Sequence, residues 1–250
     1  MSLEFFQYPY GSDNYGVLIH DKASGATASV DAGDHAATRA ALQQTGWKLS
    51  DIWITHHHGD HTAGLAKSKA ETEAYVRGPN IAHVDLVLAE GDMFEFAGQP
   101  VQVIETPGHT LDMLNFYLPQ AKVVFTGDTL FSAGCGRLFE GTAPRMHTSM
   151  NKLAALPDET VVYCSHEYTA ANVTFALSVD PSNQALKTRA EEVGSLRAKG
   201  APTVPTSIGA EKAFNPFMRT GDPTIRAALG MQNDTDEAVF AELRARKDRF

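Results

Sequence analysis

Residues 52–61 read Ile-Trp-Ile-Thr-His-His-His-Gly-Asp-His, and this stretch decides the fold. An apolar, β-branched run leads directly into five side chains of the types that bind metal ions. The run predicts a buried strand, and active-site residues of α/β proteins gather where strands end. Packing is a poor explanation for so many adjacent polar side chains, because they would be buried without partners. The stretch therefore predicts a metal site at the end of a strand.

The spacing inside this stretch separates its histidines. In extended backbone, residues two apart share a face, so His56 and His58 are expected to converge on one ion. His57 points the other way, and we expect it to support or pack rather than to bind metal. Asp60 and His61 follow in a turn that can carry their side chains toward a second ion.

Three later predicted strands run into His109, Asp128 and His166. A single Gly-His or Gly-Asp after a strand is usually a turn residue with a satisfied hydrogen bond, so each alone would indicate little. Together with the first stretch they supply five histidines and two aspartates at four strand ends. This set of ligands favours two zinc, iron or manganese ions over calcium or magnesium, with zinc as our first expectation.

Length and composition are those of an ordinary enzyme. The chain has 250 residues, 43% hydrophobic and 20% charged, which allows a full core in one large domain with a smaller appendage. A net charge of −9 disfavours nucleic acid and anionic membranes as partners, so we expect a small-molecule substrate. We also expect a monomer. Cys135 and Cys164 are expected to be buried thiols and not a disulfide.

The N-terminal residues lack the basic start and long apolar run of a secretory signal. No run reaches the ~20 apolar residues of a membrane span. We therefore expect a cytoplasmic protein.

Secondary-structure patterns change near His166. Short β-rich runs precede it, and no strand is expected after it. Helical spacing predicts helices over 35–45, 184–198 and 234–247, the last opened by Asp234 and Glu237 as a capping pair. We thus predict an α/β domain over 1–167 and a small α-helical, substrate-binding domain over 168–250. The predicted strands are 15–20, 27–31, 51–55, 101–105, 114–117, 123–126 and 160–165.

The ligand pattern resembles the metallo-β-lactamase superfamily, whose signature is a His-x-His-x-Asp-His segment followed by a distant His, Asp and His. The resemblance implies an αββα sandwich with the metal site at one edge. It also implies that Asp60 and Asp128 help to hold a metal-bridging hydroxide, the nucleophile. By this resemblance one metal would be held by His56, His58 and His109, the other by Asp60, His61 and His166, with Asp128 bridging.

Motifs beyond the ligands resemble glyoxalase II, the hydroxyacylglutathione hydrolases. The likeness extends from the first strands to the last residues and covers both predicted domains. The matching motifs are GDTLF at 127–131, GCGR at 134–137, EGT at 140–142, HEYT at 166–169, NPFMR at 215–219 and the basic RARKD at 244–248.

This closer resemblance implies how glutathione is bound. Cations would face its two carboxylates in a chain that is otherwise acidic. Two positions depart from the family pattern, because Arg137 stands where Lys is usual and Phe139 where Tyr is usual. Phe139 cannot donate a hydrogen bond. The implied substrate contacts are Arg137, Phe139, Tyr168, Asn172, Arg244 and Lys247.

The implied reaction is the hydrolysis of S-D-lactoylglutathione to glutathione and D-lactate, in methylglyoxal detoxification. A thiol with a pKa of ~8.5 leaves as thiolate without a strong general acid. A thioester therefore suits a site with no evident proton donor.

Three alternatives remain open. The first is a glutathione persulfide dioxygenase of the same superfamily, with a single iron on His56, His109 and Asp128. The basic C-terminal tail, with Arg244 and Lys247, argues against it. The second is a nuclease, which the net charge disfavours. The third is a metal-binding regulatory module without activity.

Overall fold

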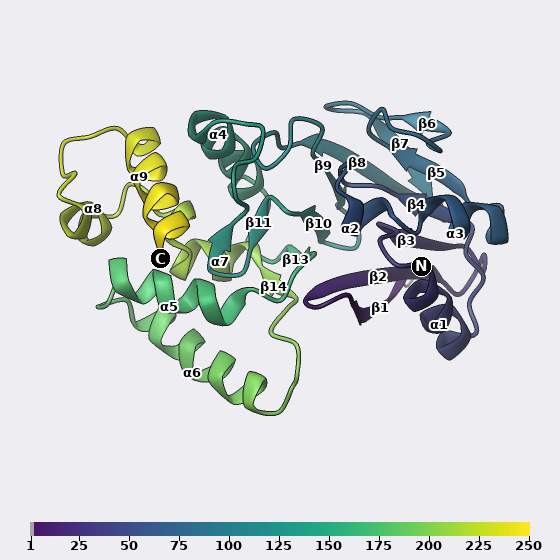
Figure 1. The fold of residues 1–250 in the computed structure, drawn as a ribbon, viewed down its shortest axis with the longest axis horizontal. Helices are drawn as coiled ribbons and strands as arrows, with labels where there is room; N and C mark the ends of the chain where they lie inside the picture. Colours follow the sequence, from purple (N-terminus) through teal and green to yellow (C-terminus); the bar gives the residue numbers. More distant parts are fainter. Residues whose placement is uncertain (1–2) are drawn as a thin grey trace. The chain divides into compact units, whose positions relative to one another are not determined.

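The computed structural model describes residues 3–250, which form two compact units (Figure 1). Of the residues described, the first unit comprises 3–105 and Asp112–Gly127, and the second comprises Thr106–Leu111 and Asp128–Phe250. Within the part of the chain described, no helix is long and apolar enough to cross a bilayer. Cys135 and Cys164 are buried free thiols, as predicted.

Two sheets build the first unit. In one sheet the strands follow chain order from β1 to β6, with antiparallel pairing at the β1–β2–β3 end and parallel pairing from β3 onward. The other is an antiparallel run from β7 to β10. The strands are β1 (Leu3–Tyr10), β2 (Asn14–Asp21), β3 (Thr27–Val30), β4 (Asp51–Trp53), β5 (Tyr75–Gly78), β6 (Leu86–Val87), β7 (Met93–Phe96), β8 (Gln99–Glu105), β9 (Leu114–Leu118) and β10 (Val123–Gly127). The helices are α1 (His35–Thr45), α2 (Gly59–Thr62) and α3 (Leu65–Thr72).

Alternation along β4 explains the layering of this unit. Ile52 and Ile54 point to one face, where they join a buried cluster with residues of α1 and α3. Trp53 points to the opposite face, and its ring lies 5.2 Å from the ring of Phe94 and 5.6 Å from that of Phe116. Because these phenylalanines belong to the second sheet, Trp53 fills the space between the sheets. This is the helix-on-sheet-on-sheet order expected of a metallo-β-lactamase fold.

Short strands and a helical region build the second unit. Two antiparallel strand pairs, the hairpin β11–β12 and the pair β13–β14, accompany the helices. In Figure 1 the green helices α5 and α6 lie side by side, and they pack through Val173, Ala176 and Leu186. The elements are β11 (Leu130–Phe131), β12 (Gly134–Cys135), α4 (Ala143–Ala154), β13 (Val161–Cys164), α5 (Thr169–Val179), α6 (Gln184–Ala198), β14 (Thr206–Ser207), α7 (Ile208–Phe214), a 3₁₀ turn η1 (Pro216–Met218), α8 (Pro223–Leu229) and α9 (Asp236–Arg249).

The predicted strands and helices have counterparts in the structure, whereas β1, β5 to β7, β11, β12, α2 to α5, α7 and α8 were not predicted. Three differences have a clear physical reason. The strand predicted over 51–55 ends at Trp53, because the N–H of Thr55 donates to the Asp31 carboxylate instead of a neighbouring strand. The last helix begins at Asp236, and Thr235 is its N-cap in place of the predicted Asp234. The Thr235 hydroxyl accepts from the N–H of Ala238, three residues on, which is the hydrogen bond of an N-cap. Finally, the prediction of no strand after His166 is wrong, because β14 pairs with β13.

Candidate metal centre

A buried aspartate organises the ligand residues of the first unit. Asp31 follows β3 in left-handed backbone, with φ of 60°. Its Oδ1 accepts from the Thr55 N–H at 2.8 Å, and its Oδ2 lies 2.7 Å from Nδ1 of His61. A carboxylate on Nδ1 holds the proton there and leaves Nε2 as the nitrogen suited to a metal. Asp31 was not predicted as a site residue from the sequence.

The same aspartate acts on a second histidine through a hydroxyl. Thr55 Oγ1 lies 3.0 Å from Nδ1 of His56 and within 3.1 Å of both Asp31 carboxylate oxygens. The consistent arrangement has the imidazole donating to the hydroxyl and the hydroxyl donating to the carboxylate. The His56 ring lies 4.1 Å from that of His61 and 4.7 Å from that of His58. The three predicted histidine ligands of this unit therefore gather in one cluster.

Asp60 lies on the short helix α2 next to this cluster, where a turn had been predicted. Its Oδ2 accepts from Asn14 at 3.0 Å and lies 3.4 Å from Nε2 of His61. Its backbone carbonyl accepts from the Tyr10 hydroxyl at 2.9 Å. Two groups of the β1–β2 hairpin thus hold the residue in place, and neither was identified from the sequence.

His57 has a different partner from its neighbours. Its Nδ1 lies 3.0 Å from Oδ1 of Asp112, and its side chain is 40% exposed. This contact is compatible with a supporting role for His57. That His57 does not bind metal stays a prediction.

The second unit brings its three predicted ligands together around Asp128. The Oδ2 atom of this carboxylate lies 3.4 Å from Nε2 of His109 and 3.3 Å from Nε2 of His166. All three residues are buried. Nδ1 of His109 donates to the carbonyl of Arg137 at 2.8 Å, and the His166 ring stacks on Tyr168 with centroids 4.8 Å apart.

Both sets of residues fit divalent metal ions. His56, His61 and His109 each have Nδ1 held by a protein oxygen, so their Nε2 atoms carry the lone pair. In each unit an Nε2 atom faces an aspartate oxygen at about the same separation. Imidazole nitrogens and carboxylates oriented by further hydrogen bonds are the environment of zinc and related metals.

The loop after β12 is closely packed behind the second set. A Cβ added to Gly136 would lie 1.9 Å from the backbone carbonyl oxygen of Asp128. One added to Gly141 would lie 2.6 Å from the Cα of Gly108. Neither position has room for a side chain. The loop backbone therefore packs directly against the backbone of Asp128 and of Gly108, the residue before His109.

The residues predicted to contact glutathione all lie in the second unit, in different environments. Arg137 and Phe139 extend from the loop with side chains that are mostly exposed, and the Phe139 ring lies 5.2 Å from that of His109. Tyr168 is also exposed. Asn172 is buried, and its amide donates to the Ser132 carbonyl at 3.1 Å.

The two predicted cations of α9 are engaged with protein groups. Arg244 is buried and donates to the carbonyl of Cys135 at 2.8 Å. Lys247 donates to the carbonyl of Ala171 at 3.1 Å, and its partial burial lowers the pKa of its ammonium. Arg137 is therefore the most accessible of the three cations.

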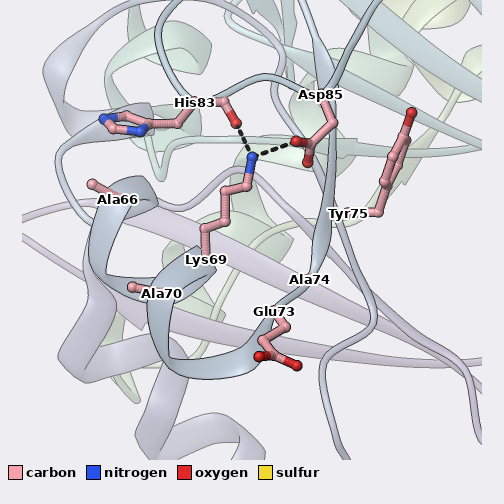
Figure 2. A pocket seen from close by; sticks show the side chains of 8 residues that line it. All are labelled: Ala66, Lys69, Ala70, Glu73, Ala74, Tyr75, His83 and Asp85. Atoms are coloured by element: carbon pink, nitrogen blue, oxygen red, sulfur yellow. Dashed lines mark hydrogen bonds and ion pairs between the residues drawn. The ribbon is translucent and has the colours of Figure 1, made fainter.

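The first unit also carries a shallow hollow of about 680 Å³ beside α3 (Figure 2). Lys69 crosses it and donates to the carbonyl of His83 at 2.9 Å and to the carboxylate of Asp85 at 2.5 Å. Its lining contains none of the predicted site residues. The lining residues are Ala66, Lys69, Ala70, Glu73, Ala74, Tyr75, His83 and Asp85.

Comparison with solved structures shows the fold. ETHE1 from Myxococcus xanthus superimposes with a TM-score of 0.67 at 26% identity, covering 99% of this chain and 98% of that one. The BLEG-1 B3 metallo-β-lactamase gives a TM-score of 0.67 at 20% identity, covering 86% of this chain and all of that one. TTHA1623, whose structure is of a di-iron-bound form, gives a TM-score of 0.61 at 23% identity, covering 85% and 99%.

Sequence comparison covers the whole chain. The metallo-β-lactamase superfamily model matches residues 18–80 and 67–166, and the model for the hydroxyacylglutathione hydrolase C-terminus matches residues 167–250. The hydroxyacylglutathione hydrolase of Rhizobium meliloti (strain 1021) is 52% identical over 100% of this chain and 99% of its own length. That of Ruegeria pomeroyi (strain ATCC 700808 / DSM 15171 / DSS-3) is 51% identical over the full length of both chains. The chain therefore belongs to the metallo-β-lactamase superfamily and, within it, to the hydroxyacylglutathione hydrolases.

Proposed function

We propose that this hydrolase cleaves S-D-lactoylglutathione to glutathione and D-lactate, and so acts in methylglyoxal detoxification. The observation that carries the proposal is in the second unit, where the carbonyl of Arg137 orients His109 at 2.8 Å. One residue thus positions a metal ligand with its backbone and offers an exposed guanidinium with its side chain. A carboxylate of glutathione is the natural partner of such a guanidinium.

The seven predicted ligands are proposed to hold two divalent ions, zinc in the first place, with iron or manganese as alternatives. Two such ions, when bound, supply a water whose pKa falls from 15.7 toward about 7, and positive charge for the developing oxyanion. The proposed grouping is His56, His58 and His109 for one ion, Asp60, His61 and His166 for the other, and Asp128 shared between them.

Side chains of the protein are proposed to position the attacking water and to bind the substrate. Asp60 and Asp128 are proposed to hold the attacking water beside the thioester carbonyl, and their carboxylates already lie beside histidine Nε2 atoms. Arg137 is proposed to bind a glutathione carboxylate. The thiol of glutathione, with a pKa of ~8.5, leaves as thiolate, so no acid is required from the protein.

The other predicted substrate contacts are proposed to bind the same glutathione thioester. Tyr168 offers a hydroxyl on an exposed side chain whose ring stacks on His166. Phe139 supplies an apolar surface where a hydroxyl is common in the family. Asn172, Arg244 and Lys247 complete the proposed binding region. Cytoplasmic location and a monomeric state also stay predictions.

The direct test is to add S-D-lactoylglutathione to zinc-loaded protein and to follow loss of thioester absorbance, with glutathione and D-lactate measured as products. Turnover with equal yields of both is expected. No turnover by protein that carries two metals per chain would refute the proposal. Oxygen uptake with glutathione persulfide, in the absence of thioesterase activity, would favour the dioxygenase instead.

A further inference from the structure

In the second unit, Arg244 of the last helix, α9, hydrogen-bonds to the backbone at the end of β12 and in the loop that follows it. Nη1 of Arg244 donates to the carbonyl of Cys135 at 2.8 Å and lies 3.5 Å from that of Gly136. Its Nη2 donates to the Asp248 carboxylate at 2.9 Å, one turn further along α9. The guanidinium is buried and lies over the ring of Phe217 at 5.4 Å. Rotation of the side chain is therefore blocked on several sides.

The backbone that Arg244 holds is connected to His109, a predicted metal ligand. The N–H of Gly136 donates to the carbonyl of Thr129 at 3.0 Å, which joins the loop to the residue after Asp128. One residue later, the carbonyl of Arg137 accepts from Nδ1 of His109. The path from Arg244 to His109 thus consists of one side-chain hydrogen bond, two residues of closely packed backbone and one hydrogen bond to the ligand.

The Asp248 carboxylate makes a second connection between Arg244 and the loop. Its Oδ1 atom, which accepts from Arg244, also lies 3.4 Å from Nε of Arg137. The same carboxylate oxygen therefore faces the arginine that holds the loop and the arginine that the loop carries.

We propose that Arg244 is a positioning residue for the metal centre. By holding the carbonyls of Cys135 and Gly136, it fixes the Arg137 carbonyl that orients the His109 ring. This role is additional to any contact with glutathione, and it rests on the proposed function only in requiring a metal at His109 and Asp128. It makes the C-terminal helix part of the metal site as well as of the substrate site.

The test compares Arg244→Met and Arg244→Lys with the wild type. Zinc affinity is measured by competition with a chromogenic chelator, and kcat and KM are measured on S-D-lactoylglutathione at saturating zinc. For R244M we expect a roughly tenfold loss of zinc affinity, the lower end of what removal of a ligand's supporting group causes, together with a lower kcat. For R244K we expect a smaller loss of both, because one ammonium cannot reach the loop carbonyls and Asp248 as a guanidinium does.

Arg246→Met is the matched control. Arg246 lies on the same helix and also points toward backbone carbonyls, but those of Ala228 and Leu229 at the end of α8. R246M should keep wild-type zinc affinity and kcat, while R244M should not.

The outcomes separate this proposal from its alternatives. Wild-type zinc affinity and kcat in R244M, with only KM raised, would overturn it and leave Arg244 as a substrate contact. If R244M does not fold, as judged by circular dichroism, R244K decides, and wild-type zinc affinity there would overturn the proposal equally. The zinc titration needs no substrate, so inactivity of the wild type toward the thioester would refute the proposed function without affecting this test.

Discussion

Asp31 shows how much of a proposed metal site can depend on a residue outside the proposed ligand set. Its carboxylate ends strand β4 through the Thr55 N–H, orients His61 directly and orients His56 through the Thr55 hydroxyl. Its role was not predicted because Asp31 is 30 residues from His61 in the sequence. The parallel pairing of β3 with β4 and the hydrogen bond from the Ala32 N–H to the His61 carbonyl at 2.9 Å bring the two together.

Asp31→Asn should weaken zinc binding about 10- to 100-fold, because an amide cannot accept from all the donors that the carboxylate serves. Competition with a chelator measures the change. Asp112→Asn is the control, since it removes the same type of partner from Nδ1 of His57, which is predicted not to bind metal. Equal zinc affinity in the two variants would contradict the role assigned to Asp31.

Phe139→Tyr should lower KM for S-D-lactoylglutathione with kcat little changed. The ring is 61% exposed on the loop beside His109, so a hydroxyl can be added without displacing core residues. One net hydrogen bond is worth about 0.5–1.5 kcal/mol, a severalfold change in binding. Steady-state kinetics with both variants measure it, and an unchanged or higher KM would show that this position lies away from glutathione.

At the scale of the element, the sequence pattern located some long helices and missed others, since α4 with 12 residues and α5 with 11 were not predicted. Helices α1 and α6 have the predicted bounds because their apolar spacing spans several turns. The two-residue strand β14 has no period to detect, and the helix α2 is shorter than two turns. The predicted ligands were identifiable because they directly follow strands or strand-like runs. Supporting groups such as Asp31, Asn14 and the Arg137 carbonyl come from distant parts of the chain and were not identifiable.

The β11–β12 hairpin depends on a buried acid of α7. Glu211 accepts from the N–H of Ala133 at 2.8 Å, from Asn215 at 2.9 Å and from the Thr206 hydroxyl at 2.8 Å. Burial nevertheless raises the pKa of its carboxyl above the usual 4.5. An acid with a raised pKa in the folded state binds its proton more tightly than in the unfolded chain. Its contribution to stability is therefore complete below pH 4.5 and is lost as the pH rises through the folded-state value.

Glu211→Gln should therefore make the free energy of unfolding less sensitive to pH above 4.5. The amide oxygen can replace the carboxylate oxygen that accepts from Ala133, and its NH₂ group can donate to Thr206. Urea unfolding of both proteins at several pH values measures the difference. A wild-type protein that gains stability relative to E211Q as the pH rises would contradict the sign.

At the scale of the whole molecule, the proposed ligands are divided between the compact units. His56, His58, Asp60 and His61 belong to the first, and His109, Asp128 and His166 belong to the second. The division was not foreseen, because the secondary-structure pattern of the sequence changes near His166, while residues 106–111 pack with the second unit.

Zinc should therefore raise the midpoint of thermal unfolding of the full chain. At a free concentration 1,000 times the dissociation constant, one site contributes about 4 kcal/mol. Asp128→Ala should abolish the rise and release both ions together, as plasma emission spectrometry of the dialysed protein would show. Asp158→Ala, at an exposed aspartate that pairs with Lys212, should behave as the wild type. Retention of two tightly bound ions by D128A would contradict the shared role.

The glycines of the loop after β12 limit which positions of this enzyme can be changed in a redesign. Gly136 and Gly141 admit no side chain, so the course of the backbone between them cannot be altered to fit a larger acyl group or a different thiol. Arg137 and Phe139, between these fixed points, extend outward and can be exchanged. A mutant library that varies these two positions and leaves the glycines intact would explore thiol selectivity while preserving the geometry behind His109.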